Sequence, residues 1–397
     1  MAMKWAVAVV LFAVLVGYQL CSPANSSLPS WPVFHLGVFL ERWLPWLYQA
    51  LTPPPVWLHR AMTGFATSKA LYLACEVGVA DLLSAGPLSS EEIAKRAGTD
   101  PERTERLMKF LAVQSVFQRI GPGIYANTAV SEYLRKDHPE SLRFYFIHLG
   151  FEFTMMFQQY LQAMYNSSLV PFNAAFNVSG VWEMMEDPAN AKVKANFDQT
   201  MVSLSAATLP QIVQDFPWSR IANATVVDVG GGKGHVAAAV LRANPGFKGV
   251  VFDLETGIEG AKVFLSEAYP DVYPHISLVN GSFFESVPTG GDFYFLKYIL
   301  HDWNDENAVK ILQTVAKALK ATREATSKSP SVLVVEQLYD YPPQHSISGF
   351  FDMMMMGISG KERTSGEFEE LMRKAGLKLV AVHPTRSVFA ILEAQLA

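Results

Sequence analysis

Hydrophobic and polar positions follow different patterns in the two halves of the chain. In the second half, continuous apolar runs typical of strands buried on both faces alternate with amphipathic helical segments. The predicted helix over residues 305–320 has one apolar face, formed by Val309, Leu312, Val315, Ala316 and Leu319. The runs that predict strands cover residues 224–229, 247–255, 276–284, 292–300 and 331–338. Together they predict an open, doubly wound α/β domain with a mostly parallel, Rossmann-like sheet.

The first half is mostly helical. Residues 64–83 carry apolar side chains at helical spacing, and two shorter helices are predicted after them. Their N-cap candidates are Ser89 or Ser90 for the first helix and Asp100 for the second. Residues 116–128 then predict a β-hairpin. Helix, helix and hairpin form a winged-helix arrangement, which raises the question of DNA binding.

The charge balance argues against DNA. Between residues 65 and 135, eight Lys and Arg balance eight Asp and Glu, so no basic stripe is predicted. The whole chain has a net charge of -5, which offers no general attraction to a polyanion. We therefore expect the winged helix to be a packing or dimerisation module, and we expect no nucleic-acid partner.

An uncharged apolar stretch lies near the start of the chain. Lys4 precedes residues 5–20, which have the length of a signal-peptide core or a short anchor. We therefore expect a protein that is membrane-associated or targeted to an organelle, with a buried helix of a globular domain as the alternative. Residues 31–51 are rich in Trp and Phe, which suits either a lipid headgroup boundary or a contact with a partner subunit.

Three parts are predicted. They are a hydrophobic leader over residues 1–54, a helical winged-helix domain over 55–215 and the α/β domain over 216–397. Half of the 397 residues are hydrophobic and 17% are charged, so a large core is available. The only cysteines, Cys21 and Cys75, cannot form a disulfide framework, which fits a reducing compartment.

A glycine-rich loop marks the predicted ligand site of the α/β domain. Gly230, Gly232 and Gly234 follow the first strand and precede a helix, and Asp253 ends the next strand. Glycines allow a ligand to approach the backbone, and an acid at the second strand end accepts hydrogen bonds from ribose hydroxyls. This pattern indicates a nucleoside-containing cofactor. Gly232, Gly234 and Ala237 also fit the dinucleotide pattern G-x-G-x-x-A, so a nicotinamide dehydrogenase remains open.

Five motifs resemble one enzyme family in their order. "DVGGGKGH", "VVFDL", "FLKYILHDWNDE", "VVEQ" and "GKERTSGEFEELMRKAGL" are similar to motifs of S-adenosylmethionine-dependent O-methyltransferases with a winged-helix N-terminal domain. That family includes caffeic acid and hydroxyindole O-methyltransferases. "GFATSKALYLACEVGVADLL" resembles the family's dimerisation region. The resemblance covers roughly residues 55 to 395 and implies a homodimer that binds S-adenosylmethionine.

The resemblance assigns the cofactor contacts. It implies that Gly230 and Gly232 approach the methionine portion and that Asp253 binds the ribose hydroxyls. It places Lys297 near the adenine end. The family usually has an acid in a "GDxF" loop over the adenine, where this chain has Ser282 and Phe283 in "GSFF".

The predicted chemistry centres on His301. A phenol with a pKa of about 10 is mostly neutral at pH 7, so a general base has to remove its proton as the methyl group arrives. His301 follows the fourth predicted strand at the carboxyl edge of the sheet, where such sheets bind ligands. The alternative is a histidine that caps the next helix. By resemblance, Glu336 and Glu362 bracket His301 and orient it.

Metal chemistry is not expected. Asp302 and Asp305 resemble a possible Mg²⁺ pair, but no further clustered ligand completes a site. Five sequons occur, at Asn25, Asn166, Asn177, Asn223 and Asn280. A glycan on Asn280 would obstruct the adenine loop, so we expect the catalytic part to face the cytosol or a plastid-like stroma.

The acceptor pocket is expected to be apolar. The methionine run at residues 353–356, which includes Met353, supplies flexible thioethers that can pack on an aromatic ring. By resemblance, Phe176, Met201 and Tyr298 line the pocket with it, Trp182 is a further candidate, and the acceptor is a small aromatic or lipophilic hydroxyl compound. Two other functions stay open on the same scaffold. A thioether or amine acceptor would give an S- or N-methyltransferase, and loss of catalysis would leave a cofactor-binding regulator.

Overall fold

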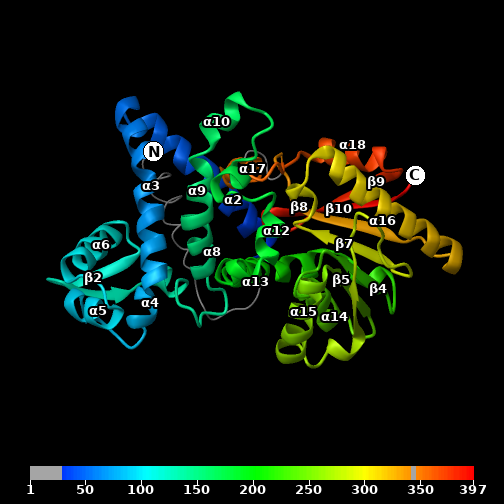
Figure 1. Ribbon diagram of the computed structural model, residues 1–397, viewed down its shortest axis with the longest axis horizontal. Helices are drawn as coiled ribbons and strands as arrows, with labels where there is room; N and C mark the ends of the chain where they lie inside the picture. Colours follow the sequence, from blue (N-terminus) through cyan, green and yellow to red (C-terminus); the bar gives the residue numbers. More distant parts are fainter. Residues whose placement is uncertain (1–28, 341–345) are drawn as a thin grey trace. The chain divides into compact units, whose positions relative to one another are not determined.

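The computed structural model of the protein describes residues 29–340 and 346–397. The chain forms two compact units (Figure 1). The first comprises the described residues up to Met155 together with Asp187–Ala207, and the second comprises Met156–Glu186 and Thr208–Ala397. This grouping differs from the expected boundary between residues 215 and 216, because Met156–Glu186 belongs to the second unit.

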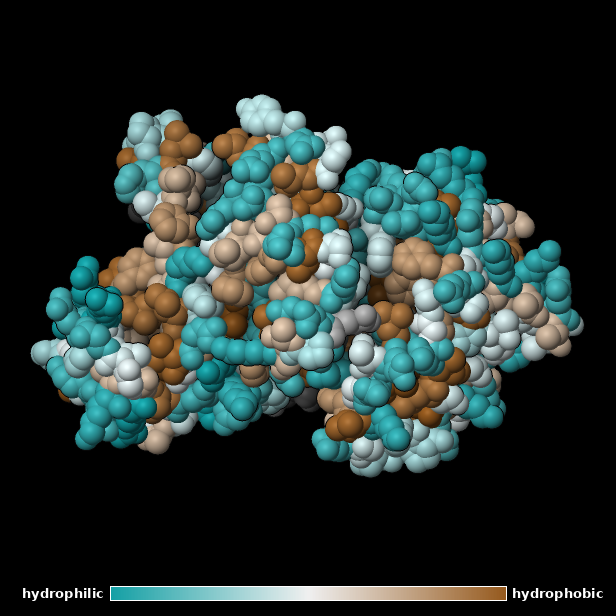
Figure 2. Space-filling view, viewed as in Figure 1, coloured by the Kyte–Doolittle hydropathy of each residue, from teal (hydrophilic) through white to brown (hydrophobic). Residues whose placement is uncertain are grey.

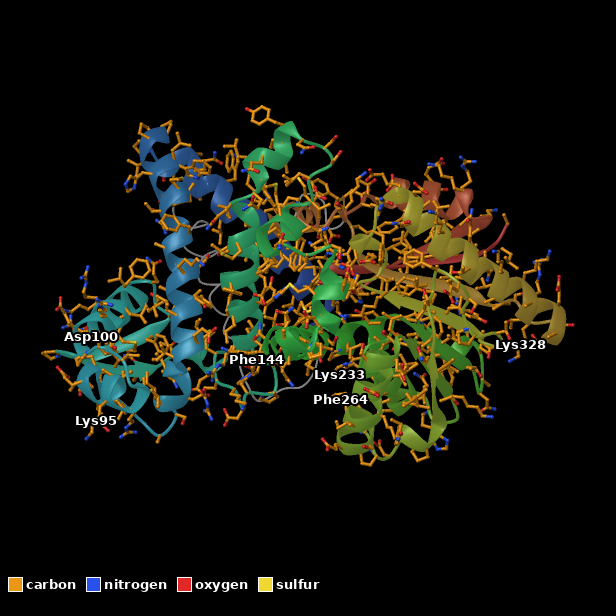
Figure 3. The ribbon with its side chains drawn as sticks, viewed as in Figure 1. Lys95, Asp100, Phe144, Lys233, Phe264 and Lys328 are labelled. Carbon is orange, nitrogen blue, oxygen red and sulfur yellow. The ribbon has the colours of Figure 1, made fainter. Side chains whose placement is uncertain are left out.

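The first unit contains the predicted winged helix. Ser89 caps α5 (Ser90–Ala97) by accepting from the backbone N–H of Glu92. Asp100, labelled in Figure 3, caps α6 (Pro101–Val113) by accepting from the backbone N–H of Arg103. Three short antiparallel strands in the order β1-β3-β2 complete it. The helices are α2 (Trp31–Leu51), α3 (Pro54–Val77), α4 (Val79–Leu82), α5 (Ser90–Ala97), α6 (Pro101–Val113), α7 (Ala129–Glu132), α8 (Arg143–His148) and the π-helix η1 (Leu149–Phe153). The strands are β1 (Leu88–Ser89), β2 (Phe117–Gly121) and β3 (Ile124–Asn127).

The prediction of membrane association can be compared with the helices in the described part of the chain. None of them is both long enough and apolar enough to cross a bilayer. The aromatic helix α2 has 21 residues, but polar side chains such as Glu41 interrupt its apolar surface. This finding overturns the prediction of a membrane-associated or organelle-targeted protein whose catalytic part faces the cytosol or a stroma. Residues 5–20, on which that prediction rested, lie outside the described residues.

The second unit is built on a seven-stranded sheet in the order β6-β5-β4-β7-β8-β10-β9. The first five strands in this order are parallel, and β10 pairs antiparallel with both β8 and β9. The predicted fold, a mostly parallel sheet beside a helical winged-helix unit, is confirmed, although the β9–β10 hairpin was not predicted. The strands are β4 (Thr225–Val229), β5 (Lys248–Asp253), β6 (Ile276–Asn280), β7 (Phe293–Lys297), β8 (Ser331–Gln337), β9 (Leu377–Pro384) and β10 (Phe389–Leu396).

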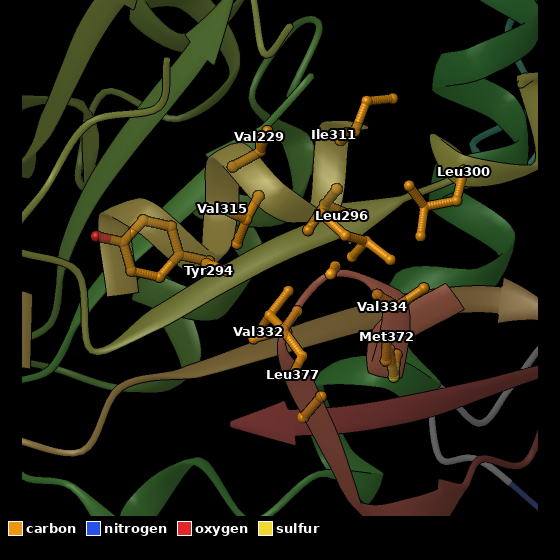
Figure 4. Packing of buried hydrophobic residues seen from close by; sticks show 14 of the residues in the cluster. Val229, Tyr294, Leu296, Leu300, Ile311, Val315, Val332, Val334, Met372 and Leu377 are labelled. Atoms are coloured by element: carbon orange, nitrogen blue, oxygen red, sulfur yellow. The ribbon is translucent and has the colours of Figure 1, made fainter. Parts of the chain in front are cut away.

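Helices cover both faces of this sheet (Figure 1). Alternate residues of each strand point to opposite faces, so β7 sends Tyr294 and Leu296 to one core and Phe293 and Phe295 to the other. Figure 4 shows the first core, where α16 and α18 pack on the sheet. The second core contains side chains of α13, α14 and α15. These helices are α13 (Ala191–Asp215), α14 (His235–Ala243), α15 (Glu255–Ala268), α16 (Asp305–Thr326) and α18 (Ser365–Lys374).

The remaining α-helices are short. They are α10 (Tyr160–Tyr165), α11 (Pro171–Phe176), α12 (Val181–Glu186) and α17 (Ser346–Met356), with α9 (Thr154–Phe157) at the boundary of the two units. Because β4, β5, β7 and β8 are parallel, the loops that follow them lie at one edge of the sheet. That edge carries the predicted functional residues.

Candidate active site

The segment after β7 carries the predicted catalytic histidine. β7 ends at Lys297, and Tyr298 adopts a left-handed backbone conformation with a φ of 56°. This conformation breaks the extended strand, which therefore ends earlier than its apolar run predicted. His301 lies instead in the short 3-10 helix η5 (Leu300–Asp302) and is buried. We call residues 298–303 the histidine turn.

Three carboxylates surround the imidazole of His301. Nδ1 lies 2.8 Å from Glu362 Oε1, within hydrogen-bond distance, and 3.9 Å from Glu336 Oε2. On the other side of the ring, Nε2 lies 3.4 Å from Asp302 Oδ1. The structure thus brings together all three predicted catalytic residues, but only Glu362 is hydrogen-bonded to the ring.

Glu336 instead holds the backbone of the histidine turn. Its Oε1 accepts from the backbone N–H groups of Ile299 at 3.1 Å, Leu300 at 2.9 Å and His301 at 3.4 Å. Glu336 is fully buried at the end of β8. A carboxylate in this position fixes the main chain that carries the imidazole, so Glu336 brackets His301 through the backbone of the turn and not through a hydrogen bond to the ring.

The charges of the cluster shift each other's ionisation. Burial by itself lowers the pKa of His301, but the negative charges of Glu336, Asp302 and Glu362 raise the pKa of the imidazole to about 10. Burial raises the pKa of Glu336 to about 7 and that of Asp302 to about 6, and the charge of His301 opposes both increases. The site therefore favours a protonated imidazole at neutral pH.

Two polar residues of this site were absent from the sequence-based prediction. Asp352 Oδ1 accepts from the backbone N–H of Glu362 at 3.0 Å. Arg363 is fully buried and donates to the carbonyls of Leu300 and Trp303. The only sequence signal for Arg363 is its position next to Glu362 in the "GKERT" motif, because burial of a charged side chain has no local pattern.

The glycine loop after β4 forms an open cradle. Gly230 and Gly232 have positive φ values of 69° and 54°, which favour glycine. A Cβ at Gly230 would lie 2.5 Å from the Ile299 side chain, whereas a Cβ at Gly232 would meet no atom within 4 Å. The open side at Gly232 leaves room for a ligand against the backbone, which fits the predicted cofactor. Lys233 in this loop and Phe264 of α15 are shown in Figure 3.

Asp253 stands beside this cradle at the end of β5. Its Oδ2 accepts from the backbone N–H of Gly232 at 2.7 Å, and its Oδ1 accepts from that of Leu254 at 2.7 Å. A carboxylate that backbone N–H groups orient at the end of a strand is the kind of acceptor that binds ribose hydroxyls. The residues present therefore fit a nucleoside cofactor.

Lys297 lies in a buried charge cluster. Burial lowers its pKa to about 8, and the charges of Asp228 and Glu336 oppose that shift. Burial likewise raises the pKa of Asp228 to about 7, and Asp228 Oδ2 accepts from the Ala237 N–H at 3.3 Å. Lys297 Nζ also lies 4.6 Å from the centroid of the Tyr298 ring. These contacts place Lys297 between the glycine loop and the histidine turn.

The predicted adenine loop is bordered by aromatic rings. Ser282 Oγ accepts from the backbone N–H of Phe284 at 3.3 Å. Phe283 lies 3.5 Å from the position of a Cβ at Gly230, so it borders the cradle. Phe283 and Phe284 both contact the ring of Trp303 edge to face.

The four predicted acceptor contacts are found in different places. Tyr298 stacks on the His301 imidazole with ring centroids 4.7 Å apart. Met353 belongs to α17, and its carbonyl accepts from the hydroxyl of Tyr160. Phe176 packs against Phe172 in α11, with centroids 4.7 Å apart. Met201 belongs to the first compact unit.

A pocket of about 220 Å³ lies beside the histidine turn. Asp302, whose Oδ1 lies 3.4 Å from His301 Nε2, contributes to its wall, whereas His301 itself is not among its lining residues. Its lining includes Trp182, the further candidate implied by the family resemblance, and none of the four predicted acceptor contacts. The described lining residues are Val170, Asn173, Ser179, Gly180, Val181, Trp182, Asp302, Trp303, Asn304, Asn307, Ile358 and Ser359.

The acids of the site do not form a metal centre. Across residues 29–340 and 346–397, no three or more His, Cys, Asp or Glu side chains are arranged to hold a metal ion. Asp305, weighed as a magnesium ligand, instead pairs with Arg363 at 2.8 Å. The absence of a metal cofactor stays a prediction.

Comparison with known proteins identifies the family. Residues 157–378 match the O-methyltransferase domain, and residues 59–137 match the O-methyltransferase dimerisation domain. The chain is 29% identical over 341 residues to the phenazine O-methyltransferase PhzM of Lysobacter antibioticus, which covers 85% of this chain and 95% of the relative.

A second relative and a solved structure indicate the same family. The chain is 32% identical over 335 residues to the 2,7-dihydroxy-5-methyl-1-naphthoate 7-O-methyltransferase of Streptomyces carzinostaticus, covering 82% of this chain and 93% of the relative. A crystal structure of the O-methyltransferase NcsB1 from neocarzinostatin biosynthesis, in complex with S-adenosylmethionine and 2-hydroxy-5-methyl naphthoic acid, superposes with a TM-score of 0.71 at 30% identity. The match covers 85% of this chain and 98% of that chain. The chain therefore belongs to the family of S-adenosylmethionine-dependent O-methyltransferases that carry an N-terminal dimerisation domain.

Proposed function

We propose that this enzyme methylates the hydroxyl group of a small aromatic acceptor, with His301 as the general base. The observation that carries the proposal is the 2.8 Å hydrogen bond between His301 Nδ1 and Glu362 Oε1. When Nδ1 donates to the carboxylate, Nε2 keeps its lone pair for the proton of the acceptor hydroxyl. In our proposal the hydroxyl approaches through the pocket lined by Asp302, whose Oδ1 lies 3.4 Å from Nε2.

The carboxylates make the imidazole a strong base. The raised pKa of His301, about 10, is close to the pKa of a simple phenol, also about 10. Matched pKa values bring proton transfer from acceptor to base near balance in free energy, which suits general base catalysis. Only the neutral imidazole accepts a proton, so kcat/KM should rise with pH until the pKa of His301 is passed.

We propose that the cofactor binds at the glycine cradle. When bound, S-adenosylmethionine supplies a methyl group on a positively charged sulfur. In our proposal Gly230 and Gly232 hold its methionine portion and Asp253 accepts from the ribose hydroxyls. The proposed neighbours of the adenine are Ser282, Phe283 and Lys297.

An aromatic acceptor is supported by two observations. The relatives are named for phenazine and naphthoate compounds, and the residues around His301 include stacked and edge-on aromatic rings. The contacts that we propose for the acceptor are Tyr298, which stacks on the His301 ring, and Trp182 of the pocket wall, with Phe176 and Met353 as further apolar contacts implied by the sequence. A thioether acceptor has no proton to lose, so it would leave the His301–Glu362 pair without a role.

We also propose a homodimer formed through the first unit. Residues 59–137 match the dimerisation domain, and α2 and α3 expose large apolar side chains, shown as hydrophobic surface along α3 in Figure 2. Leu51 and Met62 are 77% and 76% exposed. Light scattering of the purified protein is expected to give twice the mass of the chain, and a monomer would contradict the proposal.

The function is tested by methyl transfer from labelled S-adenosylmethionine to a panel of phenols, amines and thioethers. We expect O-methylated products from phenols and a loss of about 10²–10⁴-fold in turnover for His301→Ala. His275→Ala is the control, because His275 is exposed and lies outside the site. Turnover of thioethers alone, unchanged in His301→Ala, would contradict the proposal.

A further inference from the structure

The loop that carries Glu362 lies directly against the histidine turn. The backbone N–H of Lys361 donates to the carbonyl of His301 at 2.8 Å. A Cβ at Gly360 would lie 2.2 Å from the same carbonyl oxygen, so no side chain fits between the two segments. The loop and the turn therefore share one main-chain contact at His301.

Arg363 extends this contact to both sides of His301. Its Nη1 donates to the carbonyls of Leu300 at 2.9 Å and Lys361 at 3.3 Å. Its Nη2 donates to the carbonyl of Trp303 at 2.7 Å and to Asp305 Oδ1 at 2.8 Å, and its Nε donates to the same oxygen at 3.0 Å. All five N–H donors of the guanidinium are thus used.

A carboxylate and a guanidinium form hydrogen bonds with the main chain of the histidine turn. Glu336 Oε1 accepts from the N–H groups of residues 299–301, while Arg363 donates to carbonyls on either side of His301. A left-handed residue and a 3-10 helix interrupt the regular main-chain hydrogen bonds here, and the Leu300 carbonyl has only a 3.3 Å backbone hydrogen bond from Trp303. The two buried side chains supply further hydrogen bonds.

A simple ion pair is the alternative role for Arg363. Its carboxylate partner Asp305 is 57% exposed, so that pair is largely screened by water and contributes little by itself. Three of the five hydrogen bonds go to main-chain carbonyls, two of them in the histidine turn. A planar fork with five fixed donors satisfies these carbonyls, and the ammonium of a lysine does not.

We propose that Arg363 is a positioning residue for methyl transfer, which locks the histidine turn to the Glu362 loop and so holds the imidazole against both Glu362 and the acceptor. This inference rests on the proposed role of His301 as the base. Because Arg363 does not contact the glycine cradle, its replacement should affect the reaction and leave cofactor binding intact.

The test is Arg363→Lys, which keeps the charge and removes the fork. We expect kcat to fall by about 10²-fold, as for a displacement of about 1 Å at a reacting group, with binding of S-adenosylhomocysteine unchanged within about twofold. The acid limb of the pH profile should also move to lower pH, because an imidazole displaced from Glu362 loses part of the charge that raises its pKa. Arg373→Lys on α18 is the matched control, since Arg373 is 70% exposed and pairs only with Glu370 in the described structure.

The outcomes separate this inference from the proposed function. Loss of turnover in His301→Ala, with a wild-type kcat and pH profile in folded Arg363→Lys, would overturn the positioning role alone. Full turnover in His301→Ala would overturn the function itself. If Arg363→Lys does not fold, Arg363→Gln decides: it removes the guanidinium fork that binds the carbonyls of Leu300 and Trp303 and leaves no buried charge, and we expect a similar loss of kcat with the same shift of the acid limb. An unchanged kcat in that variant would overturn the inference.

Discussion

Glu362→Gln isolates the charge that acts on the catalytic imidazole. Glutamine has nearly the same size as glutamate, so the acceptor oxygen 2.8 Å from His301 Nδ1 is kept and its charge is removed. A hydrogen bond to a charged group contributes about 1.5–3 kcal/mol, and a neutral one about 0.5–1.5 kcal/mol. The substitution should therefore weaken stabilisation of the imidazolium by about 1 kcal/mol, or about fivefold in rate.

The effect of Glu362→Gln on kcat/KM should depend on pH. The negative charge of Glu362 helps to raise the pKa of His301, so its removal lowers that pKa from about 10. At neutral pH the variant has more neutral imidazole, but each imidazole is a weaker base, and the two effects nearly cancel. At a pH near 10 and above, only the weaker basicity remains. The ratio of wild-type to variant kcat/KM should thus grow from near one at about pH 7 to about fivefold at high pH.

The assay measures kcat/KM for one phenol from about pH 6.5 to pH 10.5 in the wild type and Glu362→Gln. His301→Ala in the same buffers reports the ionisation of the acceptor itself, which is then divided out. A loss by the same factor at every pH would refute the reasoning, because Glu362 would then act through structure and not through the charge on His301.

Three other predictions follow from the same contacts. Gly360→Ala would place a Cβ 2.2 Å from the His301 carbonyl and should lower kcat by about 10²-fold. Gly366→Ala is the control, because a Cβ there meets no atom within 4 Å. An unchanged kcat in a folded Gly360→Ala would contradict this prediction. Asp253→Asn should lower the affinity for S-adenosylhomocysteine, measured by calorimetry, by about 10-fold or more, since charged acceptors make the stronger hydrogen bonds. An affinity within about twofold of wild type would count against the ribose site. Glu336→Ala should lower the free energy of unfolding in urea by about 3 kcal/mol, because it leaves buried N–H groups and the charge of His301 without their partner; a loss below about 1 kcal/mol would argue against that role.

Local sequence patterns predicted the parts that local chemistry determines. Ser89 and Asp100 cap their helices as expected, since a cap needs only a short polar side chain before the first turn. The glycine loop and Asp253 were found for a similar reason, because their spacing along strand, turn and helix reflects a fixed geometry. The approach of Glu362 to His301 came from the family resemblance, and the two side chains lie 2.8 Å apart in the structure.

Long-range contacts account for what the sequence could not predict. The end of β7 depends on the left-handed conformation of Tyr298, which no local residue preference indicates. Glu336 and Arg363 are charged residues whose burial and main-chain partners arise only when distant segments meet. The β9–β10 hairpin was missed because β9, the edge strand of the sheet, exposes Val380 and Val382, so its sequence does not alternate polar and apolar residues.

The central claim, that His301 removes the acceptor proton, is tested most directly with a series of phenols whose pKa values span about 7 to 10. The measurement is the rate of methyl transfer in a single turnover, in the wild type and in His301→Ala. We predict a weak dependence on acceptor pKa in the wild type and a steep one in His301→Ala, whose rate approaches that of the wild type for phenols already ionised at the assay pH. An equal loss for every phenol in the series would contradict general base catalysis by His301.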